Sequence, residues 1–307
     1  MRVLVAVNDR AGGVDAGLYE FIRYLGREGH EVVIRFTSPG RRAEDLVKDA
    51  EEFDRVVAAG GDGTVSAICY ATHSSKVPVL VYPAGTANLL AANLGMPLDA
   101  PALSDVLLEG SVVGFDLGEL ERERADGSIV RTGFAVMAGA GYDAAIMEGA
   151  QSLKPALGSV AYLVSAVSNL MPTAASFTLT LDDITIQTDG IAVLLANFAR
   201  IQFDLPVTPG TDPQDGRFEV AVVRTKNVVG LIPVVAAAML DLVGDYPHRS
   251  PSLDLYSAST VHVIADPHLR MQADGDALET FTPFTARVLP KAAPLLVPQS
   301  SPYAAER

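Results

Sequence analysis

The sequence predicts two domains: an N-terminal α/β domain with a Rossmann-like parallel sheet and helices on both faces, and a C-terminal antiparallel β sandwich. Short β-branched runs alternate with helix-period segments as far as about residue 110, which is typical of a parallel sheet. Beyond that point strand-like runs follow one another with only turns between them, as in a sandwich or barrel. A chain of 307 residues is long enough for about two domains of roughly 150 residues each.

The first domain is expected over residues 1–110. Strands buried on both faces read as continuous apolar runs, and such runs occur at Val3–Val7, Glu31–Phe36, Arg55–Ala59 and Val77–Val81. Apolar residues at helical spacing lie between and after these runs, and they predict helices at Leu18–Leu25, Ala43–Ala50, Val65–Ala71 and Leu89–Leu94. Strand and helix therefore alternate along the whole domain.

The second domain is expected over residues 111–297, followed by a tail, 298–307, that we expect to be disordered. Its predicted strands are Val112–Leu120, Ile129–Met137, Ser176–Leu181, Ile184–Thr188, Ile191–Ala196, Phe218–Arg224, Thr260–Ile264, Leu269–Ala273 and Phe284–Leu289. Two helices are expected to interrupt them, at Leu157–Asn169 and Val228–Leu242.

Charge and cysteine content exclude several classes of protein. The sequence has 23 Lys and Arg against 37 Asp and Glu, a net charge of −14, whereas a nucleic-acid-coating protein needs a surplus of positive charge. Cys69 is the single cysteine, so no intrachain disulfide can form, which favours a reducing cytoplasm. We interpret Cys69 as a buried apolar residue. No export signal is visible, and the apolar stretch Val228–Val243 is too short and too interrupted to span a bilayer.

The strongest local signal is the loop Gly60-Gly61-Asp62-Gly63-Thr64, which follows a buried strand and begins a helix. Glycines allow a ligand to approach the backbone closely, and the start of a helix presents N–H groups and the positive end of its dipole to an anion. A plain strand-to-helix turn capped by Asp62 is the alternative. The position at the end of a central strand favours a phosphate site.

A second loop repeats this arrangement after the next strand. Val77–Tyr82 ends in Pro83-Ala84-Gly85-Thr86-Ala87-Asn88, and an apolar helix follows. The two loops together resemble the catalytic domain of diacylglycerol kinases and related bacterial lipid kinases. The first loop by itself would also suit NAD kinases and phosphofructokinases, whereas the Pro-x-Gly-Thr-x-Asn pattern is similar to the lipid kinase form.

The resemblance extends over nearly the whole chain. Asn8–Gly12 is similar to the family's turn after the first strand, and Thr37 to its nucleotide-contacting threonine. Gly139–Asp143 and Leu157–Tyr162 resemble further segments of the family. The nucleotide-binding residues that the resemblance and the two loops imply are Asn8, Thr37, Gly60, Gly61, Asp62, Gly63, Thr64, Ser66, Gly85, Thr86 and Asn88.

Two acidic turns resemble the family's metal and catalytic segments. Asp212–Phe218 is similar to the segment that holds a structural Mg²⁺, and the resemblance implies Asp212, Asp215 and the carbonyl of Arg217 as metal ligands. Asp274-Gly275-Asp276 resembles the segment that supplies the catalytic base, which implies Asp276. Without the resemblance, both stretches would be interpreted as ordinary turns.

The chain departs from the family pattern at several acidic positions. Asp276 stands where the family has glutamate, and its side chain is shorter by one carbon–carbon bond, about 1.5 Å. The first loop continues with Ser66 and Ala67 in place of Asn-Glu, and Leu89 stands where many members have an acid. Phe198–Asp204 replaces the glycine-rich stretch that precedes the metal segment.

These observations predict an ATP- and Mg²⁺-dependent lipid kinase that transfers the γ-phosphoryl group to a lipid hydroxyl, with Asp276 as general base. A catalytically impaired relative that binds lipid or nucleotide is the first alternative, and an NAD-kinase-like enzyme is the second. The lipid substrate implies transient contact with a membrane surface, made through an apolar groove or a local charge asymmetry because the chain is acidic overall. The sequence does not determine the oligomeric state, so a homodimer is left open.

Overall fold

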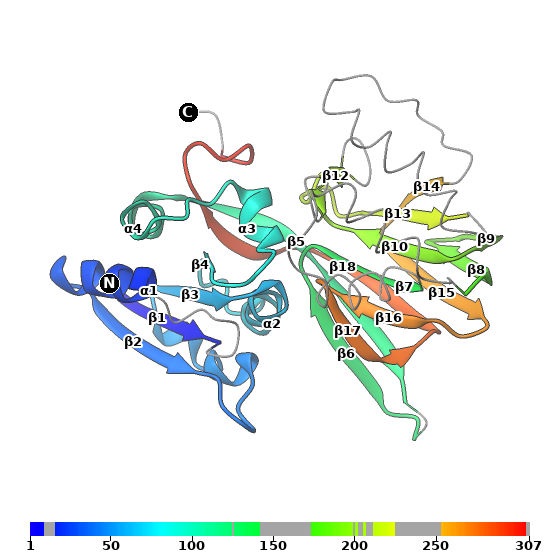
Figure 1. The fold of residues 1–307 in the computed structure, drawn as a ribbon, viewed down its shortest axis with the longest axis horizontal. Helices are drawn as coiled ribbons and strands as arrows, with labels where there is room; N and C mark the ends of the chain where they lie inside the picture. Colours follow the sequence, from blue (N-terminus) through cyan, green and yellow to red (C-terminus); the bar gives the residue numbers. More distant parts are fainter. Residues whose placement is uncertain are drawn as a thin grey trace, which may run out of the picture.

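A computed structural model describes residues 1–8, 16–124, 126–141, 173–198, 200–201, 205–206, 211–224 and 253–304. Two lobes lie side by side and are joined by long strands (Figure 1). The expected helices Leu157–Asn169 and Val228–Leu242, the segment Leu157–Tyr162 and most of Phe198–Asp204 lie outside the described residues.

The first lobe contains a parallel sheet of the strands β1 (Arg2–Val7), β2 (Glu31–Phe36), β3 (Arg55–Gly60) and β4 (Val79–Pro83), in the order β2-β1-β3-β4. Its helices are α1 (Ala16–Arg27), α2 (Asp62–Thr72), α3 (Leu89–Leu94) and α4 (Ala100–Glu109). Helix α1 packs beside α4, and α2 packs beside the short 3₁₀ helix η2 (Ala43–Leu46). The predicted fold class of this domain is confirmed.

The second lobe consists of two facing antiparallel sheets. One contains β6 (Ile129–Phe134), β8 (Ala175–Leu181), β9 (Ile184–Gly190) and β15 (Thr260–Asp266), together with parts of β5 and β18. The other has the order β14-β13-β10-β7-β16-β17, from β7 (Met137–Gly141), β10 (Ala192–Ala196), β13 (Phe218–Val223), β14 (Leu253–Ala258), β16 (Arg270–Ala273) and β17 (Asp276–Phe281). The short strands β11 (Arg200–Ile201) and β12 (Leu205–Pro206) pair with each other. The predicted β-rich class is confirmed.

Two long strands join the lobes. β5 (Ser111–Glu123) and β18 (Phe284–Val297) pair with each other along most of their length. One end of β18 pairs with β15 of the sandwich, and the other end pairs in parallel with β4. The sheet of the first lobe is therefore mixed at this edge and continues into the second lobe. The predicted boundary after residue 110 falls at the start of β5, a strand that serves both lobes.

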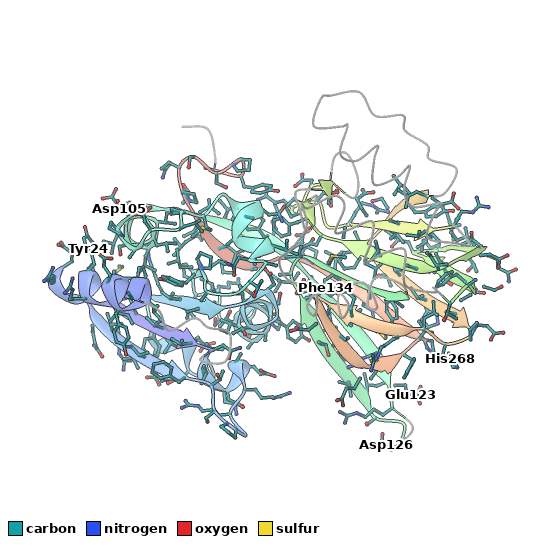
Figure 2. All side chains as sticks on the ribbon, viewed as in Figure 1. Tyr24, Asp105, Glu123, Asp126, Phe134 and His268 are labelled. Carbon is teal, nitrogen blue, oxygen red and sulfur yellow. The ribbon has the colours of Figure 1, made fainter. Side chains whose placement is uncertain are left out.

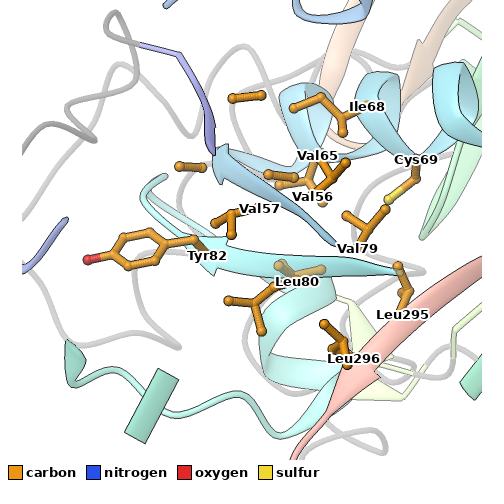
Figure 3. Close-up of a cluster of buried hydrophobic side chains, with 14 of the residues drawn as sticks. Val56, Val57, Val65, Ile68, Cys69, Val79, Leu80, Tyr82, Leu295 and Leu296 are labelled. Atoms are coloured by element: carbon orange, nitrogen blue, oxygen red, sulfur yellow. The ribbon is translucent and has the colours of Figure 1, made fainter. Parts of the chain in front are cut away.

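Each lobe has its own apolar core. Side chains of β3, β4, α2 and the end of β18 pack together in the first lobe, among them Val56, Leu80 and Leu295 (Figure 3). Cys69 belongs to this cluster, as expected, and burial raises the pKa of its thiol to about 12. A second cluster, which includes Phe134 and Phe218, fills the space between the two sheets of the sandwich. None of the described helices is long and apolar enough to cross a membrane.

The helix predicted at Ala43–Ala50 is absent. Two 3₁₀ turns stand there, η2 and η3 (Ala50–Glu52). The guanidinium of Arg35 explains the break, because it donates to the carbonyl oxygen of Leu46 at 2.7 Å and to the carboxylate of Asp49 at 2.8 Å. In an α-helix the Leu46 carbonyl would accept from the N–H four residues later, but here it accepts from the Arg35 side chain.

The C-terminal part also differs from expectation. β18 continues eight residues past the predicted end at Leu289, and the tail residues 298–304 are packed against the protein. Ser301 is buried, and the ring of Tyr303 meets that of Phe115 edge-on with 5.1 Å between centroids. The expectation of a disordered tail is therefore wrong for residues 298–304.

Candidate active site

The two glycine loops touch each other through their backbones. A Cβ atom built on Gly85 would lie 2.4 Å from the Cα atom of Gly61, closer than any real side chain is found. In the first loop, a Cβ atom on Gly60 would lie 2.7 Å from Cβ of Thr64, so glycine is also needed at that position. The loops follow β3 and β4, which pair with each other, so they lie at neighbouring strand ends as predicted, and their backbones form one continuous surface.

The side chain of Asn88 braces the second loop. Its Oδ1 accepts from the N–H of Gly85 at 2.7 Å, and its Nδ2 donates to the carbonyl oxygen of Gly85 at 2.9 Å. Asn88 itself has a positive φ of 50°, a conformation that asparagine tolerates better than most residues. Asn88 therefore shapes the loop, whose side chains Thr86 and Ala87 are exposed to solvent.

Asp62 caps the neighbouring helix instead of its own. The residue before it, Gly61, is the N-cap of α2, while Oδ1 of Asp62 accepts from the N–H of Leu90 in α3 at 3.0 Å. Burial raises the pKa of the Asp62 carboxyl, and the backbone N–H groups of α3 and its cap oppose this effect. Asp62 thus binds the two loops together and still presents a carboxylate at their junction.

Three polar side chains connect the ends of neighbouring strands. Nδ2 of Asn8 donates to Oγ1 of Thr64 at 2.7 Å, and Oγ1 of Thr37 donates to Oδ1 of Asn8 at 3.2 Å. Asn8 follows β1 and Thr37 follows β2, so this chain runs along the carboxyl edge of the parallel sheet. These predicted residues are brought together with the first glycine loop.

The structure places Ser66 against the second lobe. Its side chain is buried, and its Oγ donates to the carboxylate of Asp274 in a short hydrogen bond. The backbone N–H groups of Ala135, Val136 and Met137 donate to the same carboxylate at 2.8 to 3.0 Å. The predicted strand Ile129–Met137 is divided into β6 and β7 at this point, because these N–H groups bond to Asp274 and not to a neighbouring strand.

Asp274 was named from the sequence only as part of the acidic turn and was given no role of its own. It is 6% exposed, and burial raises the pKa of its carboxyl to about 6, although the Ser66 hydroxyl and three backbone N–H groups favour the charged form. The acidic turn Asp274-Gly275-Asp276 was the one sequence feature that pointed to this residue. The residues that donate to Asp274 lie 137 to 208 positions away from it in the sequence, which no local pattern reveals.

Asp276 projects from the hairpin between β16 and β17 onto the first glycine loop. A Cβ atom built on Gly63 would lie 2.1 Å from Oδ2 of Asp276, so the carboxylate covers the start of α2. Loss of water around the carboxyl raises the pKa of Asp276, and the negative charge of Asp62 raises it further. The side chain is still reached by solvent. Two acids from different lobes therefore meet at the glycine loops.

The predicted metal residues form a separate cluster. Asp212, Asp215 and Arg217 are exposed in a turn before β13, where Oδ1 of Asp215 accepts from the N–H of Arg217 at 2.8 Å. Next to them, buried Asp116 accepts from the N–H groups of Gly216 and Lys291, each at 2.7 Å. Burial raises the pKa of Asp116, and the charges of Asp215 and Asp212 add to the effect.

A buried amide links this cluster to the interlobe contact. Nδ2 of Asn197 donates to the carbonyl oxygens of Asp116 and Ala135, each at 2.8 Å, and Ala135 in turn donates to Asp274. Asn197 is fully buried, and no pattern in the sequence singles it out. No three acidic, histidine or cysteine side chains converge as a metal site in the described ranges.

Family models match both halves of the chain. One described as the diacylglycerol kinase catalytic domain matches residues 2–120, and one described as the YegS C-terminal NAD kinase beta sandwich-like domain matches residues 136–297. A Klebsiella pneumoniae protein named "Probable lipid kinase YegS-like" is 25% identical over 299 residues, 95% of this chain and 94% of that protein. The diacylglycerol kinase of Mycobacterium tuberculosis is 27% identical over 236 residues, 74% and 72% of the two chains.

Solved structures share the fold. The crystal structure of a diacylglycerol kinase from Bacillus anthracis superposes with a TM-score of 0.69 at 18% identity and covers 99% of this chain and 98% of its own. Yeast NADH kinase superposes with a TM-score of 0.55 at 14% identity over 96% and 82% of the two chains. At these identities the likeness concerns the fold alone.

Replacing Ser66 with alanine is expected to destabilise the protein, and more so at neutral than at acidic pH. The hydroxyl of Ser66 favours the charged form of Asp274, so its loss costs most above the Asp274 pKa of about 6, where the carboxyl is ionised. We expect a loss of about 1–3 kcal/mol at pH 7.5 and a smaller loss at pH 5, measured by urea unfolding. Ser74→Ala, at an exposed serine, is the control, and equal losses at both pH values would contradict the prediction.

Replacing Asp62 with asparagine is expected to lower the pKa of Asp276. Asparagine keeps an oxygen for the N–H of Leu90 but removes the negative charge that raises the Asp276 pKa. The measurement is a ¹³C carboxyl NMR titration of the ligand-free protein. Asp105→Asn, at an exposed position on α4, should leave the Asp276 titration where it is, and the prediction fails if the two variants behave alike.

Proposed function

Because the chain belongs to the family that joins a diacylglycerol kinase catalytic domain to a YegS C-terminal β-sandwich domain, we propose that it is an ATP-dependent lipid kinase acting on the hydroxyl of a diacylglycerol-like lipid. One observation carries the proposal. The carboxylate of Asp276, supplied by the second lobe, lies directly on the glycine loop of the first lobe. A proton acceptor thus stands beside a backbone surface suited to phosphates.

The glycine loops are proposed to hold the nucleotide phosphates. Their backbones are in contact at Gly61 and Gly85, so side chains are absent where phosphate oxygens would approach N–H groups. The start of α2 adds the positive end of a helix dipole at the same place. Thr64 and Thr86 would supply hydroxyl groups, and Thr37 would contact the nucleotide from the end of β2.

Asp276 is proposed to accept the proton of the attacking lipid hydroxyl. Burial and the charge of Asp62 raise the pKa of its carboxyl, which makes the carboxylate a stronger base than that of an ordinary aspartate. Although its side chain is shorter than that of glutamate, its carboxylate lies against Gly63 of the glycine loop. The lipid would enter from the second lobe, where the base is anchored.

Magnesium is proposed at two places. Mg²⁺ bound with ATP would neutralise the charge that develops on the transferred phosphoryl group, and Asp62 would hold it directly or through water. Asp212, Asp215 and the carbonyl of Arg217 would hold a structural ion. Their donors are all oxygens, as Mg²⁺ prefers, and their charges raise the pKa of Asp116, while the guanidinium of Arg217 pairs with Asp182.

A catalytically impaired binding protein is the second candidate. Leu89 is buried where many family members have an acid, and Ala67 replaces another, so fewer carboxylates surround the phosphate site. Phosphorylation of NAD is the third candidate and is supported only by the shared fold. We further propose that the protein is cytoplasmic and contacts membranes transiently. Analytical sedimentation, which measures the mass of the assembly in solution, will distinguish a monomer from a homodimer.

The first test is transfer of ³²P from labelled ATP, with Mg²⁺, into a panel of lipids in mixed micelles, with NAD as a further acceptor. We expect label in one lipid, and we expect Asp276→Asn to reduce turnover at least about 100-fold because the proton acceptor is lost. The KM for ATP should change little, since Asp276 accepts from the lipid. Label in NAD, or none in any acceptor despite ATP binding, would replace the proposal by one of the alternatives.

A second test concerns the nucleotide loops. Gly85→Ala places a Cβ atom 2.4 Å from the backbone of Gly61 and must push the two loops apart. We expect ATP to bind at least about tenfold more weakly by calorimetry. Gly26→Ala, whose Cβ atom would meet nothing within 4 Å, is the matched control. Unchanged ATP affinity in a folded Gly85→Ala protein would contradict the assignment of the loops.

A further inference from the structure

The end of the chain packs across the first lobe. Residues 298–304, which we call the C-terminal strap, follow β18 and turn twice, with the N–H of Ser301 donating to the carbonyl oxygen of Pro298 and the N–H of Ala304 to that of Ser301. A Cβ atom built on Gly95, just after α3, would lie 3.8 Å from Cα of Ser301. Figure 1 shows this end of the chain in red beside α3. The strap is therefore in contact with the end of α3.

The ring of Tyr303 completes a junction of three aromatic rings. It meets the ring of Phe115 edge-on with 5.1 Å between centroids, and that of Phe198 edge-on at 6.0 Å. The two phenylalanine rings lie 5.6 Å from each other, and both residues are buried. Phe115 belongs to β5, whereas Phe198 comes two residues after the end of β10 in the sandwich. The strap thus holds the end of a sandwich strand against the core of the first lobe.

The chain at Phe198 holds the carbonyl groups between β6 and β7. The N–H groups of Asn197 and Phe198 both donate to the carbonyl oxygen of Val136, at 2.9 and 3.4 Å. Nδ2 of Asn197 donates to the carbonyl oxygen of Ala135 at 2.8 Å. The segment Ala135–Met137 is therefore fixed on its carbonyl side by residues that adjoin the aromatic junction.

The N–H groups of the same segment all point to Asp274. They donate to its carboxylate at 2.8 to 3.0 Å, and the N–H of Asp274 donates back to the carbonyl oxygen of Met137 at 2.8 Å. Phe134, the residue before the segment, lies at the end of the sandwich that faces the first lobe (Figure 2). Two residues beyond Asp274, Asp276 stands over Gly63. The segment thus connects the aromatic junction with the proposed base.

We propose that Tyr303 is a positioning residue for the proposed reaction. Its ring fixes Phe198, and the backbone at Phe198 fixes the segment that receives Asp274. Asp276 is thereby kept over the glycine loop. The role of Asp276 as a base rests on the proposed function, whereas its place over the loop does not. The competing explanation is that the strap only covers apolar surface, in which case Tyr303 stabilises the first lobe as a whole.

The first measurement is amide hydrogen exchange of the full-length, ligand-free protein by NMR. We expect Tyr303→Ala to speed exchange in Ala135–Met137 at least about tenfold more than in β3, because the segment loosens locally. Tyr303→Phe keeps the ring and should exchange like the wild type. Leu25→Ala is the matched control, since Leu25 is buried in the same core but belongs to α1. It should speed exchange in the segment and in β3 alike.

The second measurement is a ¹³C carboxyl titration of Asp276. Loss of water and the charge of Asp62 both raise the pKa of this carboxyl, so a carboxylate that leaves the glycine loop titrates at lower pH. We expect Tyr303→Ala to lower the pKa of Asp276. Tyr303→Phe and Leu25→Ala should leave it where it is in the wild type.

Two results would overturn the proposal. Exchange in Ala135–Met137 that speeds up no more than in β3 would reduce the strap to a cover of the core. An unchanged pKa of Asp276 in Tyr303→Ala would show that the place of the acid does not depend on the strap. If Tyr303→Ala does not fold, Tyr303→Leu, which keeps apolar volume and removes the ring, decides in the same two measurements. Neither measurement involves turnover, so failure of the proposed kinase activity leaves the result unaffected.

Discussion

The buried carboxylate of Asp274 is the contact on which the arrangement of the two lobes depends. It accepts a hydrogen bond from Ser66 in the first lobe and three from consecutive backbone N–H groups in the second. A buried carboxylate is costly unless each of its oxygens is satisfied, so the donors must stay where they are. The break between β6 and β7 is a consequence, because the backbone there bends to present its N–H groups to Asp274.

The position of Asp276 follows from that contact. Two residues beyond Asp274, after the turn at Gly275, the chain is brought back over Gly63, and the second acid reaches the glycine loops. The proposed base and the phosphate surface come from different lobes, so the chemistry requires the lobes to be held in register. β17 then continues to Thr280, whose hydroxyl accepts a hydrogen bond from Arg122 of β5, so the strand that carries Asp276 also contacts the other sheet of the sandwich.

Local patterns predicted much of this molecule. The parallel strands, the β-rich second half and the two glycine loops at neighbouring strand ends follow from apolar periodicity and from strand order, and all are present. The errors have physical causes: Arg35 takes the carbonyl that a helix at Ala43–Ala50 would need, and aromatic contacts order the tail at Tyr303. Ser66 was predicted at the nucleotide, and its hydroxyl bonds to Asp274 on the buried side of α2.

By itself the sequence determined which elements form and which loops carry glycine, acid and hydroxyl groups, since these depend on residues within a few positions of each other. Tertiary structure decided which of those groups meet. Asp62 caps a helix other than its own, Asp274 joins segments up to 208 residues apart, and Arg122 finds its partners on two different sheets. Hydrogen bonds of this kind depend on how whole sheets pack, and nothing within a short stretch of chain encodes their geometry.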